Sequence, residues 1–121
     1  MKRTPRHRPE RLAALVHETL ATALTTSLKD PRIGFVTITG VHVTADGHHA
    51  TVRVSVLGTE EEKGRAMDGI EHAKGFLRTQ LARTLALRVT PELHFELDRG
   101  LEHARRIDAL LDQVRGEGDP A

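Results

Sequence analysis

Two basic side chains in this sequence, Lys74 and Arg78, have a spacing suited to binding phosphate groups. Residues four positions apart on a helix lie on the same face, so both cations would project from one side. If a helix begins beside Lys74, its free backbone N–H groups would also favour a phosphate there. We therefore predict that Lys74 and Arg78 contact the phosphates of a nucleic acid; the alternative is that they form only the solvated side of an amphipathic helix.

Other basic residues are weaker candidates for the same role. Blocks of like charge mark a solvated end or an interaction arm, so the basic N-terminus is either an RNA-binding arm or a frayed end. Arg53 falls on the polar side of a predicted strand, and Arg88 follows a predicted helix. The further candidates for RNA contact are Arg88, Arg3, Arg6, Arg8, Arg11, Arg32 and Arg53.

No pattern of nucleophiles, acids or metal ligands predicts an active site. The sequence has eight histidines, but none has zinc-site spacing, and adjacent residues such as His48 and His49 rarely converge on one ion. Ser27 and Ser55 lack a nucleophile-elbow pattern, and no Gly-Lys-Ser/Thr phosphate loop occurs. We predict a protein that is not an enzyme and has no catalytic residue, cofactor, metal or small-molecule substrate.

Composition favours one domain that acts in the cytoplasm. The 121 residues are 38% hydrophobic, which suffices for one core, and the chain has no cysteine and no apolar run long enough for a bilayer. Net charge is only +1, and three phenylalanines are the only aromatic residues. Base stacking on aromatic rings is therefore scarce, so RNA affinity would come from backbone charge and shape.

The elements that must position these side chains follow from hydrophobic periodicity. A helix is predicted from Pro9 to the Asp30-Pro31 break, with its apolar residues at helical spacing. Two β-branched strands, 33–44 and 50–56, are predicted to form an antiparallel hairpin, with a bulge at Gly40 that keeps one buried face. Thr59 and Glu62 form a capping-box pattern before a helical segment over 60–86, and a third strand covers 93–97.

Gly75 is predicted to break the helical segment into two helices. A straight helix from 60 to 86 would run about 40 Å and overhang strands of roughly 20–27 Å. A kink at Ala73-Lys74-Gly75 would fold it into two shorter helices, since glycine accepts the left-handed conformation that ends a helix. Gly69 is the competing break point, and a tolerated mid-helix glycine remains the alternative.

The predicted order, with a short junction between two helices, is that of a type II KH domain, but Ala73-Lys74-Gly75 stands where a Gly-x-x-Gly loop is usual. In this the chain resembles the bacterial ribosome-binding factor A family of KH-like ribosome assembly factors. The fragments that carry the resemblance are Lys29-Asp30-Pro31-Arg32, Thr37-Ile38-Thr39 with Val41, Gly75-Phe76-Leu77-Arg78, Leu87-Arg88, Pro91-Glu92-Leu93-His94-Phe95 with Asp98, and Arg106-Ile107 with Leu110-Leu111. Gly100 departs from the serine that the family usually has two residues after this aspartate.

The resemblance implies an α+β fold: a three-stranded sheet with helices packed on one face, plus a short C-terminal helix. We expect a flexible basic N-terminus over 1–8, a KH-like RNA-binding domain over 9–98, and a C-terminal helix with a frayed tail over 99–121.

It also implies a non-catalytic, monomeric factor. Such a factor binds the free small (30S) ribosomal subunit, assists late maturation and 5′-end processing of 16S rRNA, and supports growth in the cold. Two alternatives stay open: a general KH-like RNA-binding protein with another target, and a protein-interaction adaptor.

Overall fold

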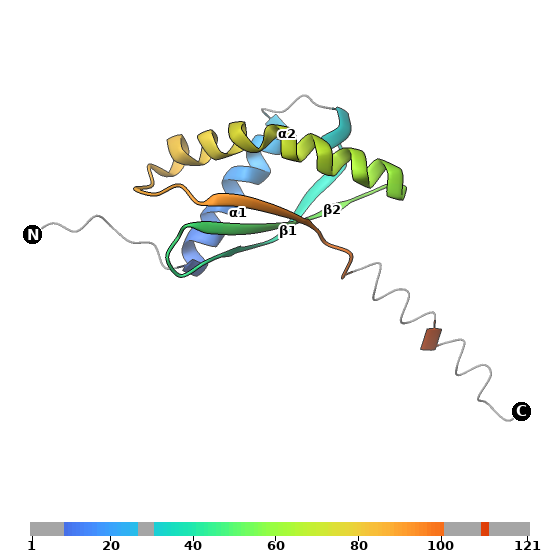
Figure 1. Cartoon of the computed structure of the whole chain (residues 1–121), viewed down its shortest axis with the longest axis horizontal. Helices are drawn as coiled ribbons and strands as arrows, with labels where there is room; N and C mark the ends of the chain where they lie inside the picture. The colour runs from blue at the N-terminus through green and yellow to red at the C-terminus, as the bar shows by residue number, and fades with distance from the viewer. Residues whose placement is uncertain (1–8, 27–30, 101–109, 112–121) are drawn as a thin grey trace, which may run out of the picture.

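The computed structural model describes residues 9–26, 31–100 and 110–111. Its elements follow the order α1 (Pro9–Thr26), the 3-10 turn η1 (Pro31–Ile33), β1 (Val36–Val43), β2 (His49–Val56), α2 (Glu60–Leu85) and β3 (Glu92–Leu97) (Figure 1). The predicted N-terminal segment lies outside the described residues, and so does the predicted C-terminal segment apart from Arg99, Gly100, Leu110 and Leu111. Within the described part, neither helix combines the length and apolar character that crossing a bilayer would require.

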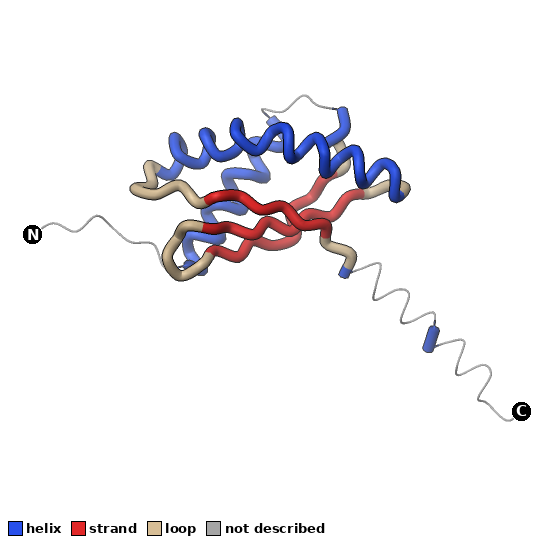
Figure 2. The backbone as a smooth tube through the Cα atoms, in the orientation of Figure 1, coloured by secondary structure: helices blue, strands red, loops and turns tan. Residues whose placement is uncertain are grey.

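The sheet has the strand order β1-β2-β3 and is mixed (Figure 2). β1 and β2 pair antiparallel, so the predicted hairpin is confirmed. Their register shifts between Ile38 and Gly40, leaving Thr39 as the extra residue of a bulge, as the change of parity predicted. β3 pairs parallel with β2, which places His49 opposite Glu92 and Val54 opposite Leu97.

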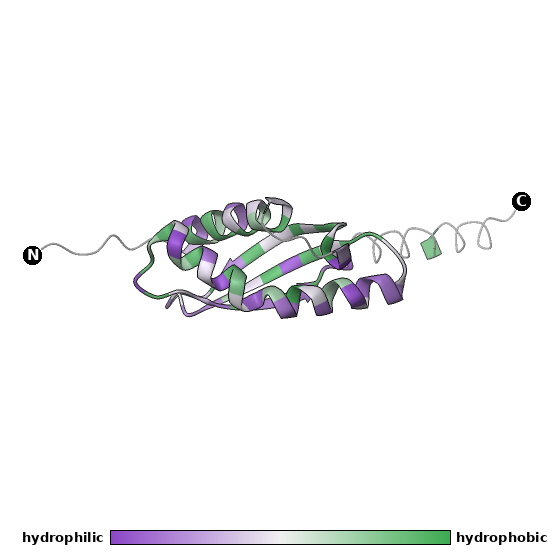
Figure 3. Cartoon of the chain, turned by 90° about the horizontal axis from the view of Figure 1, so that it is seen from above, coloured by the Kyte–Doolittle hydropathy of each residue, from purple (hydrophilic) through white to green (hydrophobic). Residues whose placement is uncertain are grey.

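Both helices cover the same face of this sheet, as predicted (Figure 1). α1 packs on β1, α2 packs on β3, and the helices also contact one another. Figure 3 shows hydrophilic and hydrophobic residues alternating along α2, as expected for a helix with one buried side. Both helices and the strands β2 and β3 contribute fully buried hydrophobic residues: Val16, Leu20, Val52, Val54, Ile70, Leu77, Leu81 and Leu93.

α2 is one continuous helix, so the predicted break at Gly75 into two helices is wrong. The predicted break rested on helix length and assumed that α2 could bury its apolar side only against the sheet. In the structure, the N-terminal half of α2 also packs on η1, where Gly69 lies against Ile33 and Arg32, and the C-terminal half packs beside α1. Buried residues accordingly run from Lys63 to Leu81, and 26 residues find partners without a bend being required.

The predicted start of α2 is confirmed in detail. The Thr59 hydroxyl accepts a hydrogen bond from the Glu62 backbone N–H at 3.1 Å, and the Glu62 carboxylate accepts one from the Thr59 N–H at 3.2 Å. Together these bonds make the capping box. The helix ends at Ala86, whose φ of 47° is left-handed. Here an alanine occupies a conformation that favours glycine.

Candidate nucleic-acid interface

Lys74 and Arg78 lie one helical turn apart on α2, so they share one side of the helix. Lys74 Nζ forms an ion pair with Glu71 Oε2 at 2.9 Å, and its side chain is about one-third exposed. Arg78 is exposed, and its Nη2 donates to the Thr90 carbonyl oxygen at 3.2 Å, in the loop between α2 and β3. This bond orients the guanidinium and leaves its other donors for a ligand.

The prediction that free backbone N–H groups would hold a phosphate beside Lys74 is wrong, because no helix begins there. Residues 74–78 are interior to α2, where backbone N–H groups bond to carbonyl oxygens one turn back. A phosphate on this side of α2 would therefore be held by side chains alone. Glu71 weakens the site further, since its carboxylate competes with phosphate for Lys74.

Arg88 extends the same edge of the molecule. It is exposed in the loop from Ala86 to Pro91, two residues before the Thr90 carbonyl that holds Arg78. No ion pair to Arg88 is found within the described residues. We call Lys74, Arg78 and Arg88 the α2–β3 basic edge. Of its three cations, Lys74 is paired with the carboxylate of Glu71.

A second basic surface lies on the other side of α2. Nine residues separate Arg65 from Lys74, which is about two and a half turns, so they point to opposite sides. Arg32 and Arg65 line a shallow hollow with Pro31, Phe35, Val56, Leu57 and Glu62. Phe35 is 70% exposed and Leu57 75% exposed. We call this hollow the Phe35 patch.

Sequence reasoning missed Phe35 and Arg65 as possible contacts. It treated the aromatic residues as too few for base stacking, yet one of them, Phe35, is exposed in a hollow that two arginines also line. The available signal was position: Phe35 precedes the first strand residue that packs on the core, Val36. A large apolar side chain outside the buried pattern often marks a binding surface.

Arg53 lies on the outer face of the sheet, which neither helix covers. Its Nε is 3.8 Å from Glu96 Oε2, and both side chains are well exposed. Nearby, the Thr39 hydroxyl donates to Asp98 Oδ2 at 2.6 Å, tying the β1 bulge to the end of β3. This bond, followed by one from the Gly100 N–H, lowers the pKa of Asp98. Carboxylates thus accompany Arg53, and the outer face is not uniformly basic.

The N-terminal candidates are mostly outside the described residues. Arg3, Arg6 and Arg8 fall in the segment before α1. Arg11 is exposed in the first turn of α1. The other candidates that the structure describes occupy three places: the α2–β3 basic edge, the surface with Arg32, and the outer sheet face with Arg53.

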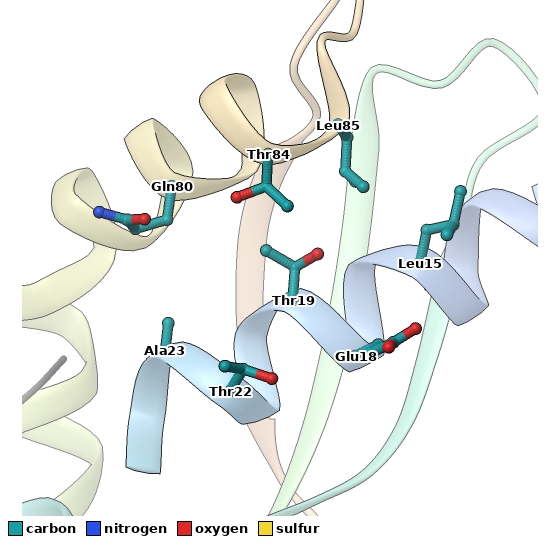
Figure 4. A pocket seen from close by; sticks show the side chains of 8 residues that line it. All are labelled: Leu15, Glu18, Thr19, Thr22, Ala23, Gln80, Thr84 and Leu85. Atoms are coloured by element: carbon teal, nitrogen blue, oxygen red, sulfur yellow. The ribbon is translucent and has the colours of Figure 1, made fainter. Parts of the chain in front are cut away.

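The hollow between α1 and α2 is a poor phosphate site (Figure 4). Its polar lining consists of threonine hydroxyls, the Gln80 amide and the Glu18 carboxylate, and it includes no lysine or arginine among the described residues. Figure 4 shows Thr19 of α1 and Thr84 of α2 pointing toward each other. A carboxylate without a neighbouring cation repels phosphate, so this hollow is not part of the candidate interface.

One cluster of possible metal ligands was not foreseen. His49, Glu92 and His94 bring together ligand atoms that all lie within 4.8 Å of one another. The spacing of histidines along the chain predicted no such site, because the proximity depends on the parallel pairing of β2 with β3. The available signal was the alternation in 92–97, which puts Glu92 and His94 on the polar side of one strand.

Comparison with known proteins gives one consistent result. A family model described as ribosome-binding factor A matches residues 8–111. The ribosome-binding factor A of Geobacter metallireducens is 43% identical over 110 residues, which cover 91% of this chain and 93% of the relative. That of Geobacter sulfurreducens is 41% identical over 111 residues, covering 92% and 94%.

Solved structures agree. The crystal structure of ribosome-binding factor A from Thermus thermophilus is 29% identical, with a TM-score of 0.67, and the match covers 76% of this chain and 97% of that one. A homology model of the Thermus thermophilus factor, fitted into a cryo-electron-microscopy map of its complex with 30S, is 30% identical with a TM-score of 0.60, covering 71% and 90%. The KH-like α+β arrangement of this chain is consistent with these structures.

Proposed function

The chain belongs to the ribosome-binding factor A family, and from that membership we propose that it binds the free small (30S) ribosomal subunit as a non-catalytic assembly factor. The observation that carries this proposal is the likeness to the Thermus thermophilus factor fitted into a 30S complex. A particle of this kind is assembled in the cytoplasm, and the protein would act there.

The finer role follows from what the family resemblance implies. The protein assists late maturation of 16S rRNA, including its 5′ end, and this help matters most in the cold, when rRNA rearranges slowly. A factor without an active site can act by binding one conformation of the immature rRNA more tightly than another. A tenfold preference of this kind shifts the equilibrium by about 1.4 kcal/mol.

The α2–β3 basic edge is the surface that we propose faces the rRNA. Lys74, Arg78 and Arg88 supply three cations on a rigid helix and the adjoining loop. Arg78 is already oriented by Thr90, so less side-chain entropy is lost when it binds. Because the described residues place no helix N-terminus at this edge, the contacts to phosphate are expected to come from side chains.

The test is sedimentation of the full-length protein with purified 30S subunits at moderate salt. The wild-type protein should migrate with free 30S and be absent from 70S ribosomes. Lys74→Glu combined with Arg78→Glu should reduce co-sedimentation at least about tenfold, since two attractive contacts become repulsive. Thermal unfolding would check that this variant remains folded.

A matched control variant distinguishes an error in the proposed rRNA-facing surface from an error in the proposed function. Arg32→Glu combined with Arg65→Glu changes the same charge on the opposite side of α2 and should leave binding nearly intact. If this control alone loses 30S, the function stands and the rRNA-facing surface is the Phe35 patch instead. Absence of wild-type protein from the 30S fraction contradicts the proposed function itself.

A protein-interaction adaptor is a second candidate, favoured by one observation. Phe35 and Leu57 are the most exposed of the large hydrophobic residues described, and their backbones are joined by the Leu57 N–H bonding to the Phe35 carbonyl at 3.3 Å. Exposed apolar pairs of this kind commonly bind proteins. Phe35→Ser combined with Leu57→Ser would abolish partner binding under the adaptor hypothesis and spare 30S binding under ours.

A further inference from the structure

Three side chains that can ligate metals meet on the outer face of the sheet, away from the helices. His49 begins β2, and Glu92 and His94 occupy alternate positions of β3. The parallel register pairs His49 with Glu92 and Thr51 with His94, so His49 is adjacent to both. The Glu92 N–H bonds to the His48 carbonyl at 2.8 Å, which fixes the two strands at this point.

The distances fit the coordination of one small ion. His49 Nδ1 lies 3.0 Å from His94 Nε2 and 3.9 Å from Glu92 Oε2. Two ligands of a tetrahedral zinc ion, each about 2.0–2.1 Å from the metal, are separated by about 3.3–3.4 Å. These two separations bracket this value, and the ligand atoms of His94 and Glu92 lie within 4.8 Å of each other. Shifts of up to about 1.5 Å in these surface side chains would therefore bring all three ligands to one ion.

The donor set also has a clear chemical preference. Imidazole nitrogen suits zinc, copper and nickel, and a carboxylate oxygen joins it in many zinc sites. Calcium and magnesium prefer oxygen ligands only, and this set offers one carboxylate. We propose that His49, Glu92 and His94 form a binding site for a divalent transition-metal ion, with zinc the best fit and a water molecule as the fourth ligand.

The contact between the two imidazole rings would favour binding of a cation. The two rings are tilted by 32° with their centroids 5.2 Å apart, and nitrogen faces nitrogen at 3.0 Å. Such a contact requires a shared proton, because two lone pairs or two protons would repel. A cation between the nitrogens satisfies both lone pairs at once and is balanced by Glu92. Protons compete for the same nitrogens, so binding should weaken in acid.

The experiment uses tag-free full-length protein titrated with Zn²⁺ by calorimetry and with Co²⁺ by visible absorption. Cobalt reports geometry, because tetrahedral sites absorb far more strongly than octahedral ones. The wild-type protein should bind one equivalent of each ion saturably and gain thermal stability, and a chelator should reverse both effects. His49→Ala and His94→Ala should abolish this binding, and Glu92→Gln should weaken it at least about tenfold.

The matched control is His48→Ala, which removes the neighbouring histidine outside the cluster and should bind like the wild type. All four variants change side chains on the sheet surface or the turn, and circular dichroism would check their fold. Failure of the wild-type protein to bind one equivalent saturably would overturn the proposal. The proposal would also be overturned if His49→Ala and His94→Ala bound the ions as tightly as the wild type, or if His48→Ala lost binding.

Discussion

Gly75 occupies a position that favours alanine, and Ala86 occupies one that favours glycine. Gly75 is interior to α2, and a side chain added there would meet no atom within 4 Å. Ala86 ends the helix in the left-handed conformation, with φ 47° and ψ 43°. Glycine in a helix interior loses more backbone entropy than alanine, whereas alanine in the left-handed region is strained.

Gly75→Ala is therefore expected to stabilise the protein by about 0.5–1 kcal/mol. The measurement is urea unfolding followed by circular dichroism. Ala86→Gly is the companion variant and should also stabilise, by about 1 kcal/mol, because it relieves the left-handed strain. A break at Gly75 in solution would reverse the first result, since alanine would then be forced into a left-handed turn.

An ion pair joins the start of α2 to the segment just after β3. The Arg99 guanidinium donates to both oxygens of Glu60, at 2.7 and 2.6 Å. Lys63, which is buried, lies 3.7 Å from the same carboxylate. The hydrogen bonds from Arg99 are the main cause that lowers the pKa of Glu60 from 4.5 to about 2.

This pair predicts a loss of stability in acid. A carboxyl whose pKa is lowered by folding stabilises the folded state above its unfolded pKa and loses that effect as pH falls. For Glu60 the loss should occur between about pH 4.5 and pH 2. Arg99→Gln should unfold more easily than the wild type at pH 7, and the difference should shrink on acidification through this window.

Urea midpoints measured from pH 7 to pH 2 would check this prediction. Glu96→Gln is the control, because the contact of Glu96 with Arg53 is long and its side chain is exposed. That variant should follow the wild-type pH profile. If Arg99→Gln is equally destabilising at pH 2 and pH 7, the ion pair does not carry the effect.

The elements that the sequence predicted correctly are those determined by neighbouring residues. Thr59 and Glu62 cap α2 through bonds three residues apart, and the parity change around Gly40 marks the bulge in β1. The break at Gly75 was predicted wrongly because the partners of α2 beyond the sheet, η1 and α1, are distant in sequence. The His49–Glu92–His94 cluster was missed for the same reason: it depends on which strand β3 joins and in which register.

At the scale of the whole molecule, net charge is less informative than the distribution of charge. The formal charge is +1, yet three cations gather at the α2–β3 basic edge while Glu60, Glu61 and Glu62 cluster at the start of α2. Cations accompany those carboxylates, since Arg99 and Lys63 lie beside Glu60, and Arg32 and Arg65 line a hollow with Glu62. The α2–β3 basic edge would still favour one orientation of approach to a polyanion, even though long-range attraction is weak.

The salt dependence of 30S binding should reveal how many phosphates the protein contacts. Removing one cation that touches a phosphate lowers the slope of log affinity against log salt concentration by about one. Lys74→Gln, Arg78→Gln and Arg88→Gln should each reduce the slope by that amount. Arg53→Gln should leave it unchanged, because Arg53 lies on the outer sheet face near Glu96. Equal slopes for all four variants would contradict the assignment of the basic edge.

The parallel pairing of β3 with β2 also sets an order of events during synthesis. The β1–β2 hairpin can close as soon as residue 56 has left the ribosome, since its partners are close in sequence. β3 must wait until α2, which precedes it in the chain, has been made. Newly made chains therefore expose the unpaired edge of β2 until β3, with its buried Leu93, arrives to pair with it.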